Sequence, residues 1–189
     1  MWAILNEPII ITLLTLSVGG LLFNWLTAHR ARKEKIREKA IELLEEVGRD
    51  LNSAISLIFG RIRNNSFVIE NDSPFEEKRR ELFTKRFTVR IRSKTYLKSD
   101  EFWQKYERLL FELDRIIRLI KSLSKDYDLV KLVSEIQKKK KRLEQDWPIG
   151  ESAFNSKYDP PSNELEEWTH MVFNRAVWLL TVNLKIVLE

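Results

Sequence analysis

The sequence predicts an all-α protein with one N-terminal transmembrane helix followed by a cytosolic helical bundle of about five helices. Three observations predict this architecture. The chain of 189 residues has a long uncharged run near its start. Beyond that run, apolar residues recur at helical spacing, and the segments that carry them begin with Ser or Asn capping patterns. We therefore expect a transmembrane anchor over residues 1–28 and a cytosolic domain over residues 29–189.

The run Ile9–Ala28 contains 20 residues without a charge. As a helix it is about 30 Å long, which matches the hydrocarbon core of a bilayer. No Lys or Arg precedes it, and a basic cluster that begins at Arg30 follows it. The positive-inside rule then places the N-terminus outside and the rest of the chain in the cytoplasm. We expect an uncleaved, single-pass protein of the inner membrane.

Small and polar residues share one face of this predicted span. That face contains Ser17, Gly20, Asn24 and Thr27. Polar atoms are costly against lipid, so such a face is typical of a contact between helices or of a pore lumen. The alternative is that these residues reflect the ordinary composition of membrane helices. We expect a homo-oligomer that assembles through this face.

The cytosolic part divides into a juxtamembrane helix over residues 29–63 and a bundle over residues 73–189. The first bundle helix starts at the capping box Ser73–Glu76 and is strongly basic. Between Lys78 and Lys98 it has nine Lys or Arg residues and one acid, Glu81. A strand is the alternative for its end, where apolar and charged residues alternate. Five arginines form a candidate site for an anionic ligand: Arg79, Arg80, Arg86, Arg90 and Arg92.

Three more helices are expected, over residues 99–123, 129–146 and 164–188. The second carries the basic run Lys138–Arg142, which we interpret as a solvated face. The third is apolar nearly all round and is predicted to be a central bundle helix. A second membrane span and an oligomer contact are the alternatives for it. The predicted core consists of Leu109, Leu113, Ile116, Ile120, Trp168, Val172 and Leu179.

The composition offers little catalytic chemistry. The chain has no cysteine and only two histidines, His29 and His170, so no thiolate or histidine metal site is expected. None of the five glycines forms a phosphate-binding loop motif. We therefore predict no enzyme activity, no catalytic residue, no metal and no cofactor.

The whole layout resembles the small membrane effectors of prokaryotic antiphage defence. The shared features are one N-terminal span, a basic juxtamembrane helix and a small helical cytosolic domain without a catalytic set. The resemblance is greatest to the membrane accessory protein of type VI-B CRISPR systems, and it implies a ring-shaped pore that depolarises the inner membrane. The cytosolic domain of that family is HEPN-like with an Arg/Asn-His motif. The residues around His170 lack that motif, so the resemblance implies no site residues here.

Two functional hypotheses follow. The first is an oligomeric pore or channel-type effector, gated through its basic cytosolic domain in antiphage defence. The second is a non-conducting membrane-anchored module that recruits RNA, a nucleotide or a protein partner such as a nucleoprotein complex. Both place the juxtamembrane residues beside anionic lipid.

Overall fold

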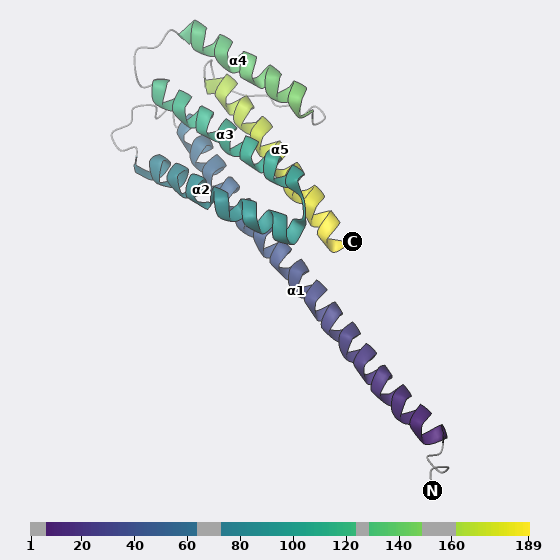
Figure 1. The fold of residues 1–189 in the computed structure, drawn as a ribbon. Coiled ribbons are helices and arrows are strands. Elements are labelled where there is room, and N and C mark those ends of the chain that lie inside the picture. The colour runs from purple at the N-terminus through teal and green to yellow at the C-terminus, as the bar shows by residue number, and fades with distance from the viewer. Residues whose placement is uncertain (1–6, 64–72, 124–128, 149–161) are drawn as a thin grey trace. The chain divides into compact units, whose positions relative to one another are not determined.

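The computed structural model describes residues 7–63, 73–123, 129–148 and 162–189 (Figure 1). Side chains are described at residues 20, 22–63, 74–120, 130–148 and 163–189. The elements are α1 (Glu7–Arg63), α2 (Ser73–Arg92), a π-helical turn (Ser93–Leu97), α3 (Asp100–Leu123), α4 (Leu129–Asp146) and α5 (Ser162–Leu188). Within these ranges the chain has five α-helices and no strand. The all-α prediction is confirmed, and the strand alternative for the end of the basic helix is wrong.

Helix ends follow local sequence signals. Helix α1 ends at Arg63 and α2 begins at Ser73, as the sequence predicted. The hydroxyl of Ser99 accepts a hydrogen bond of 3.0 Å from the backbone N–H of Phe102, which caps α3. Lys98, between the π-helical turn and α3, has a left-handed backbone with φ of 52°. This conformation reverses the chain direction between α2 and α3.

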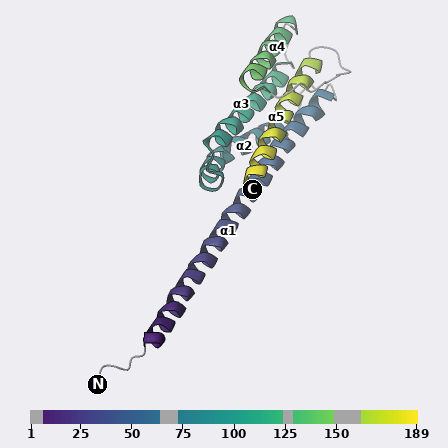
Figure 2. The same ribbon diagram turned by 90° about the vertical axis from the view of Figure 1, so that its right-hand side faces the viewer.

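The chain divides into an N-terminal unit, Met1–Lys39, and a bundle unit, Ala40–Glu189. In the bundle unit α3 packs against both α2 and α5, and α4 packs against α5. Figures 1 and 2 show this group from two directions. Helix α1 contributes an apolar stripe to the same core, with Ala40, Leu43, Val47, Leu51, Ile55, Ile58 and Ile62 all buried. Every predicted core residue from Leu109 to Leu179 is also buried, which confirms that prediction.

In the N-terminal unit the backbone is helical from Glu7 onward. All side chains from Leu22 to Glu38 are exposed, and four large apolar ones stand between Leu22 and Leu26. They are Leu22, Phe23, Trp25 and Leu26, with exposed fractions of 55%, 68%, 62% and 47%. The indole of Trp25 stacks on His29, with ring centroids 5.5 Å apart. The described side chains of this chain leave these four apolar side chains largely exposed.

One helix in the described part of the chain, α5, is long and apolar enough to cross a membrane. That segment is Asn163–Leu188, with a mean hydropathy of 1.4. The candidate span therefore lies at the C-terminus, whereas the sequence predicted the N-terminal run Ile9–Ala28. Side chains 9–19 and 21 of that run lie outside the described residues, so the N-terminal span stays a prediction.

Helix α5 also has the features of a bundle helix. Trp168 and Val172 are fully buried, and so are the polar side chains of Arg175 and Asn183, apart from a few per cent of their surface. The guanidinium of Arg175 donates to the carbonyl of Trp147 from Nε at 3.1 Å and from Nη2 at 2.7 Å. Because a buried charge needs hydrogen-bond partners, these two hydrogen bonds fix the end of α4 against α5.

We predict that Leu113→Ala lowers the free energy of unfolding by about 2–5 kcal/mol, because Leu113 lies at the centre of the α3 core face and truncation leaves a cavity. Guanidinium unfolding of the full chain in detergent, followed by tryptophan fluorescence, measures this change. Val130→Ala is the control, since Val130 is 80% exposed. The core assignment fails if both variants unfold at the same denaturant concentration.

Candidate functional site

The basic helix α2 faces carboxylates on two neighbouring helices, α1 and α3. Its buried apolar residues are Phe75, Leu82 and Val89, which are seven residues apart along the helix. Three side chains on 20 residues form a narrow apolar contact. Phe83 adds a partly buried apolar contact, and ion pairs connect α2 with carboxylates of α1 and α3.

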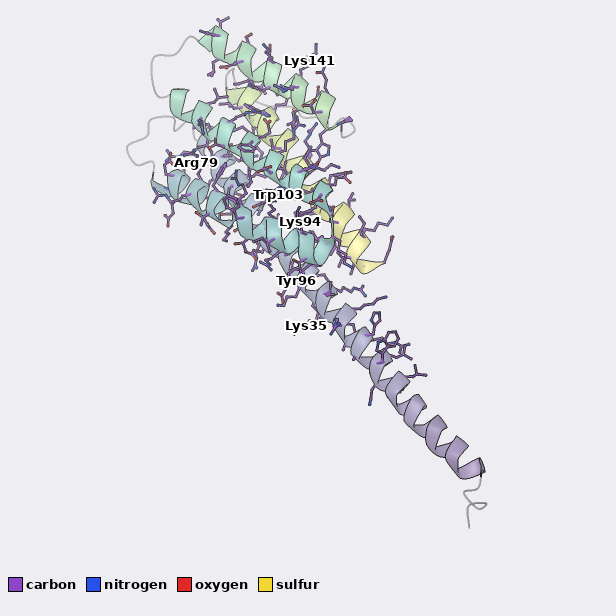
Figure 3. All side chains as sticks on the ribbon, in the orientation of Figure 1. Lys35, Arg79, Lys94, Tyr96, Trp103 and Lys141 are labelled. Carbon is purple, nitrogen blue, oxygen red and sulfur yellow. The ribbon has the colours of Figure 1, made fainter. Side chains whose placement is uncertain are left out.

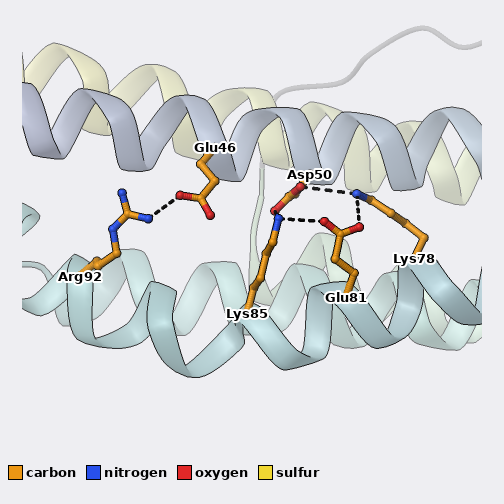
Figure 4. Close-up of polar contacts among 6 residues, drawn as sticks. All are labelled: Glu46, Asp50, Lys78, Glu81, Lys85 and Arg92. Atoms are coloured by element: carbon orange, nitrogen blue, oxygen red, sulfur yellow. Dashed lines mark hydrogen bonds and ion pairs between the residues drawn. The ribbon is translucent and has the colours of Figure 1, made fainter.

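Asp50 of α1 is the centre of the contact between α1 and α2 (Figure 4). It is 9% exposed and accepts hydrogen bonds from Lys78 Nζ at 3.4 Å and Lys85 Nζ at 3.0 Å. Glu81 lies between the same two lysines, 2.8 Å from each. These hydrogen bonds hold the pKa of Glu81 below its usual range and raise the pKa of Lys85. The four charges form an alternating network that keeps α2 on α1.

Glu46 lies one helical turn before Asp50 and accepts a hydrogen bond from Arg92 at the end of α2. The hydroxyl of Tyr106 from α3 is buried nearby and has no partner among the described side chains. Burial, with the negative charges of Asp50 and Glu46, raises the pKa of this hydroxyl. The hydroxyl of Tyr106 therefore stays protonated, and the side chain is fully buried.

On the opposite side α2 is paired with α3. Arg79 donates to the buried carboxylate of Asp114 and, at 3.2 Å, to Glu76. The hydrogen bond to Asp114 raises the pKa of Arg79. Arg86 is 3.7 Å from Glu107, and its guanidinium lies over the rings of Phe83 and Phe87 at 5.9 and 5.0 Å. Figure 3 labels Arg79 on α2.

Two of the five predicted arginines differ from the rest. Arg80 and Arg90 are exposed and form no ion pair with any residue that the structure describes. The guanidinium of Arg90 lies 5.6 Å from the ring centroid of Trp103, which Figure 3 labels. Phe87 and Ile91 are exposed on the same helix, by 59% and 67%. This outer face of α2 combines cations with apolar surface.

The structure thus changes the basis of the predicted anionic-ligand site. The sequence suggested that the charge of this helix was uncompensated, since only one acid lies within it. In the fold, Arg79, Arg86 and Arg92 each meet a carboxylate from α1 or α3. One signal could have indicated this: Glu46 and Asp50 stand four residues apart, beside the buried stripe residues Val47 and Leu51.

The predicted pore or oligomer face is described in part. Gly20, Asn24 and Thr27 are exposed, and a side chain added at Gly20 would meet nothing within 4 Å. The hydroxyl of Thr27 donates to the carbonyl of Phe23. The side chain of Ser17 lies outside the described residues. The described members of this face are open to contact by another chain.

Among the residues that the structure describes, no group of three or more His, Asp or Glu side chains could hold a metal ion. His170, tilted against Phe59 with ring centroids 4.7 Å apart, is a packing residue. The absence of catalysis, metal and cofactor stays a prediction.

We predict that Asp50→Asn destabilises the bundle by about 1.5–3 kcal/mol, because it leaves two partly buried ammonium groups with weaker partners. The measurement is guanidinium unfolding at neutral pH. Glu101→Gln is the control and should cost less than about 1 kcal/mol, since the Glu101–Lys105 pair is at the surface. Equal effects from the two substitutions would contradict a central role for Asp50.

Comparison of the chain with protein family models, curated proteins and solved structures finds no match. The resemblance to antiphage membrane effectors accordingly stays a prediction.

Proposed function

We propose that this chain is a single-span membrane protein that self-associates through its N-terminal helix into a pore or channel-type effector. The observation that carries the proposal is the exposed apolar surface between Leu22 and Leu26. Each large apolar side chain left in water forgoes about 1.5–3 kcal/mol. Lipid or a neighbouring copy of the helix removes this cost, and the basic cluster from Arg30 holds the following residues on the cytoplasmic side of the inner membrane.

The small and polar face supports assembly of several copies. The amide of Asn24 is costly against lipid, whereas it forms hydrogen bonds with the same residue of a neighbour. Gly20, one turn earlier, allows two helix backbones to approach closely. Ser17 and Thr27 extend the same face in both directions. Assembly of several copies gives these polar groups hydrogen-bond partners that lipid does not supply.

An effector pore must stay closed until it is signalled, because an open hole in the inner membrane is toxic. Gating then requires a ligand or partner that binds the open and closed assemblies with different affinity. For an anionic trigger we assign Arg80 and Arg90 as the receivers. Arg92, a candidate from the sequence, is held by Glu46, and Arg79 and Arg86 are held by α3.

A non-conducting anchored binding module is the second candidate. The ion pairs favour it, since they hold α2 on α1 and α3 as part of a single packed bundle. Such a bundle presents Arg80, Phe87, Arg90 and Ile91 on a fixed surface. Phosphates of RNA or of a nucleoprotein complex would pair with the arginines of that surface.

We predict that Asn24→Leu weakens self-association by about 0.6–2 kcal/mol, because it removes the interhelical hydrogen bond. Mass measurement of the full chain in detergent gives the oligomer size, and ion flux from liposomes gives conductance. Phe23→Leu is the matched control, since it changes an apolar residue on another face. A monomeric wild-type chain would refute the pore, and an oligomer without flux would favour the binding module.

We further predict that the double substitution Arg80→Gln and Arg90→Gln lowers membrane depolarisation during phage challenge at least about tenfold, because two charge-assisted contacts to an anionic trigger are lost. Oligomer size and membrane localisation should be unchanged. Lys138→Gln with Lys141→Gln is the charge-matched control. Undiminished depolarisation would remove Arg80 and Arg90 from the mechanism.

A further inference from the structure

The side chains of the basic run Lys138–Arg142 point in three directions around α4. Consecutive helical residues are rotated by about 100°, so five adjacent cations do not share one face. Lys140 donates to Glu164 at 2.7 Å and to Glu167, and so ties α4 to α5. Lys138 and Lys141 are exposed, and Figure 3 labels Lys141. Lys139 and Arg142 line a cleft between α3 and α4.

The cleft has a volume of about 330 Å³ and is lined by four cations and three carboxylates. Arg108 and Arg115 come from α3, and Lys139 and Arg142 come from α4. A nearly balanced lining is unsuited to a long polyanion. It suits a small ligand that has both acidic oxygens and hydrogen-bond donors, and the volume is that of a small-molecule site.

The α3 cations of the cleft are fixed in position. Arg108 Nη2 donates to Asp146 at 2.5 Å, and Arg115 Nη1 donates to the buried carboxylate of Glu112 at 2.7 Å. Both side chains remain partly exposed, at 33% and 44%, so they can accept a second partner. Because these contacts already order the two side chains, ligand binding loses less side-chain conformational entropy.

The α4 cations are available to a ligand. Arg142 is 71% exposed and only loosely paired, with its Nε 3.9 Å from Asp146. Lys139 forms no ion pair with a residue in the described part of the chain. Arg and Lys together are a common pair for phosphate, because Arg binds two oxygens at once and Lys adds a mobile charge.

An aromatic ring completes the cleft. Phe111 lines it, is 44% exposed, and is held edge-on by Phe83 with ring centroids 6.1 Å apart. An exposed ring on a fixed helix gives a planar ligand a surface to stack on. Glu107, one turn before Phe111, also lines the cleft and can accept hydrogen bonds from an amino group of that ligand.

We propose that the cleft between α3 and α4 binds a mononucleotide, with its base against Phe111 and its phosphate on Lys139 and Arg142. This site is separate from the arginines of α2, and it does not depend on pore assembly. Its binding can therefore be measured in detergent whether the chain is a monomer or an oligomer.

The test is calorimetric titration of the full chain in detergent with AMP, GMP, adenosine and inorganic phosphate. We expect at least one of the two nucleotides to bind more than tenfold more tightly than both adenosine and phosphate. The double variant Lys139→Gln with Arg142→Gln should lose at least tenfold in nucleotide affinity. The matched variant Lys138→Gln with Lys141→Gln has the same loss of charge and should stay within twofold of wild type.

Phe111→Ala provides a second variant that changes neither charge nor core, because Phe111 is exposed. It should weaken nucleotide binding at least fivefold and leave any phosphate binding unchanged. The proposal is overturned if neither AMP nor GMP binds the wild-type chain, or if both glutamine double variants lose affinity equally. Phosphate binding as tightly as the nucleotides would equally overturn the assignment of the base to Phe111.

Discussion

The carboxylates of α1 are the polar contacts that hold the basic helix α2 in the bundle unit. Helix α2 buries only Phe75, Leu82 and Val89, which is a small apolar contact for 20 residues. Asp50 and Glu46 add to this contact by neutralising cations of α2 at partly buried positions, as do Asp114 and Glu107 of α3, the other neighbour of α2. The apolar stripes of α1 and α3 form the core itself, and this charge pairing fixes α2 beside them. Several cations of α2 are thus paired within the fold, and fewer of them are available to a binding partner than the net positive charge of the chain suggests.

The sequence predicted most of the fold because helix ends and buried stripes are local. The hydroxyl of Ser99 caps α3 through a hydrogen bond within three residues, and α1 ends and α2 begins at the predicted residues Arg63 and Ser73. Core residues such as Leu113 and Trp168 repeat at helical spacing. The candidate site was less predictable, since the partners of Arg79 and Arg92 lie 35 and 46 residues away. No local pattern indicates which distant carboxylate a given arginine meets.

The hydropathy of a helix and its surroundings in the fold also lead to different conclusions about which helix crosses the membrane. By hydropathy α5 is a candidate span, yet its polar groups Arg175 and Asn183 are satisfied by backbone carbonyls inside the bundle. The helix before residue 40 has the reverse character, with large apolar side chains from Leu22 to Leu26 facing outward. Helix α5 also exposes Val177, Ile186 and Leu188, so its internal polar hydrogen bonds, more than its burial, distinguish it from the N-terminal helix. This contrast supports the proposal that α1 carries the anchor and that α5 packs in the bundle.

The bond between Arg175 and the carbonyl of Trp147 has a consequence for synthesis on the ribosome. The end of α4 is completed by a side chain 28 residues further along the chain. The apolar face of α3 is likewise covered only once Trp168 and Val172 of α5 are present. A nascent chain therefore exposes the apolar face of α3 until α5 has been synthesised, and binding by chaperones during that interval is expected to decide the yield of folded protein.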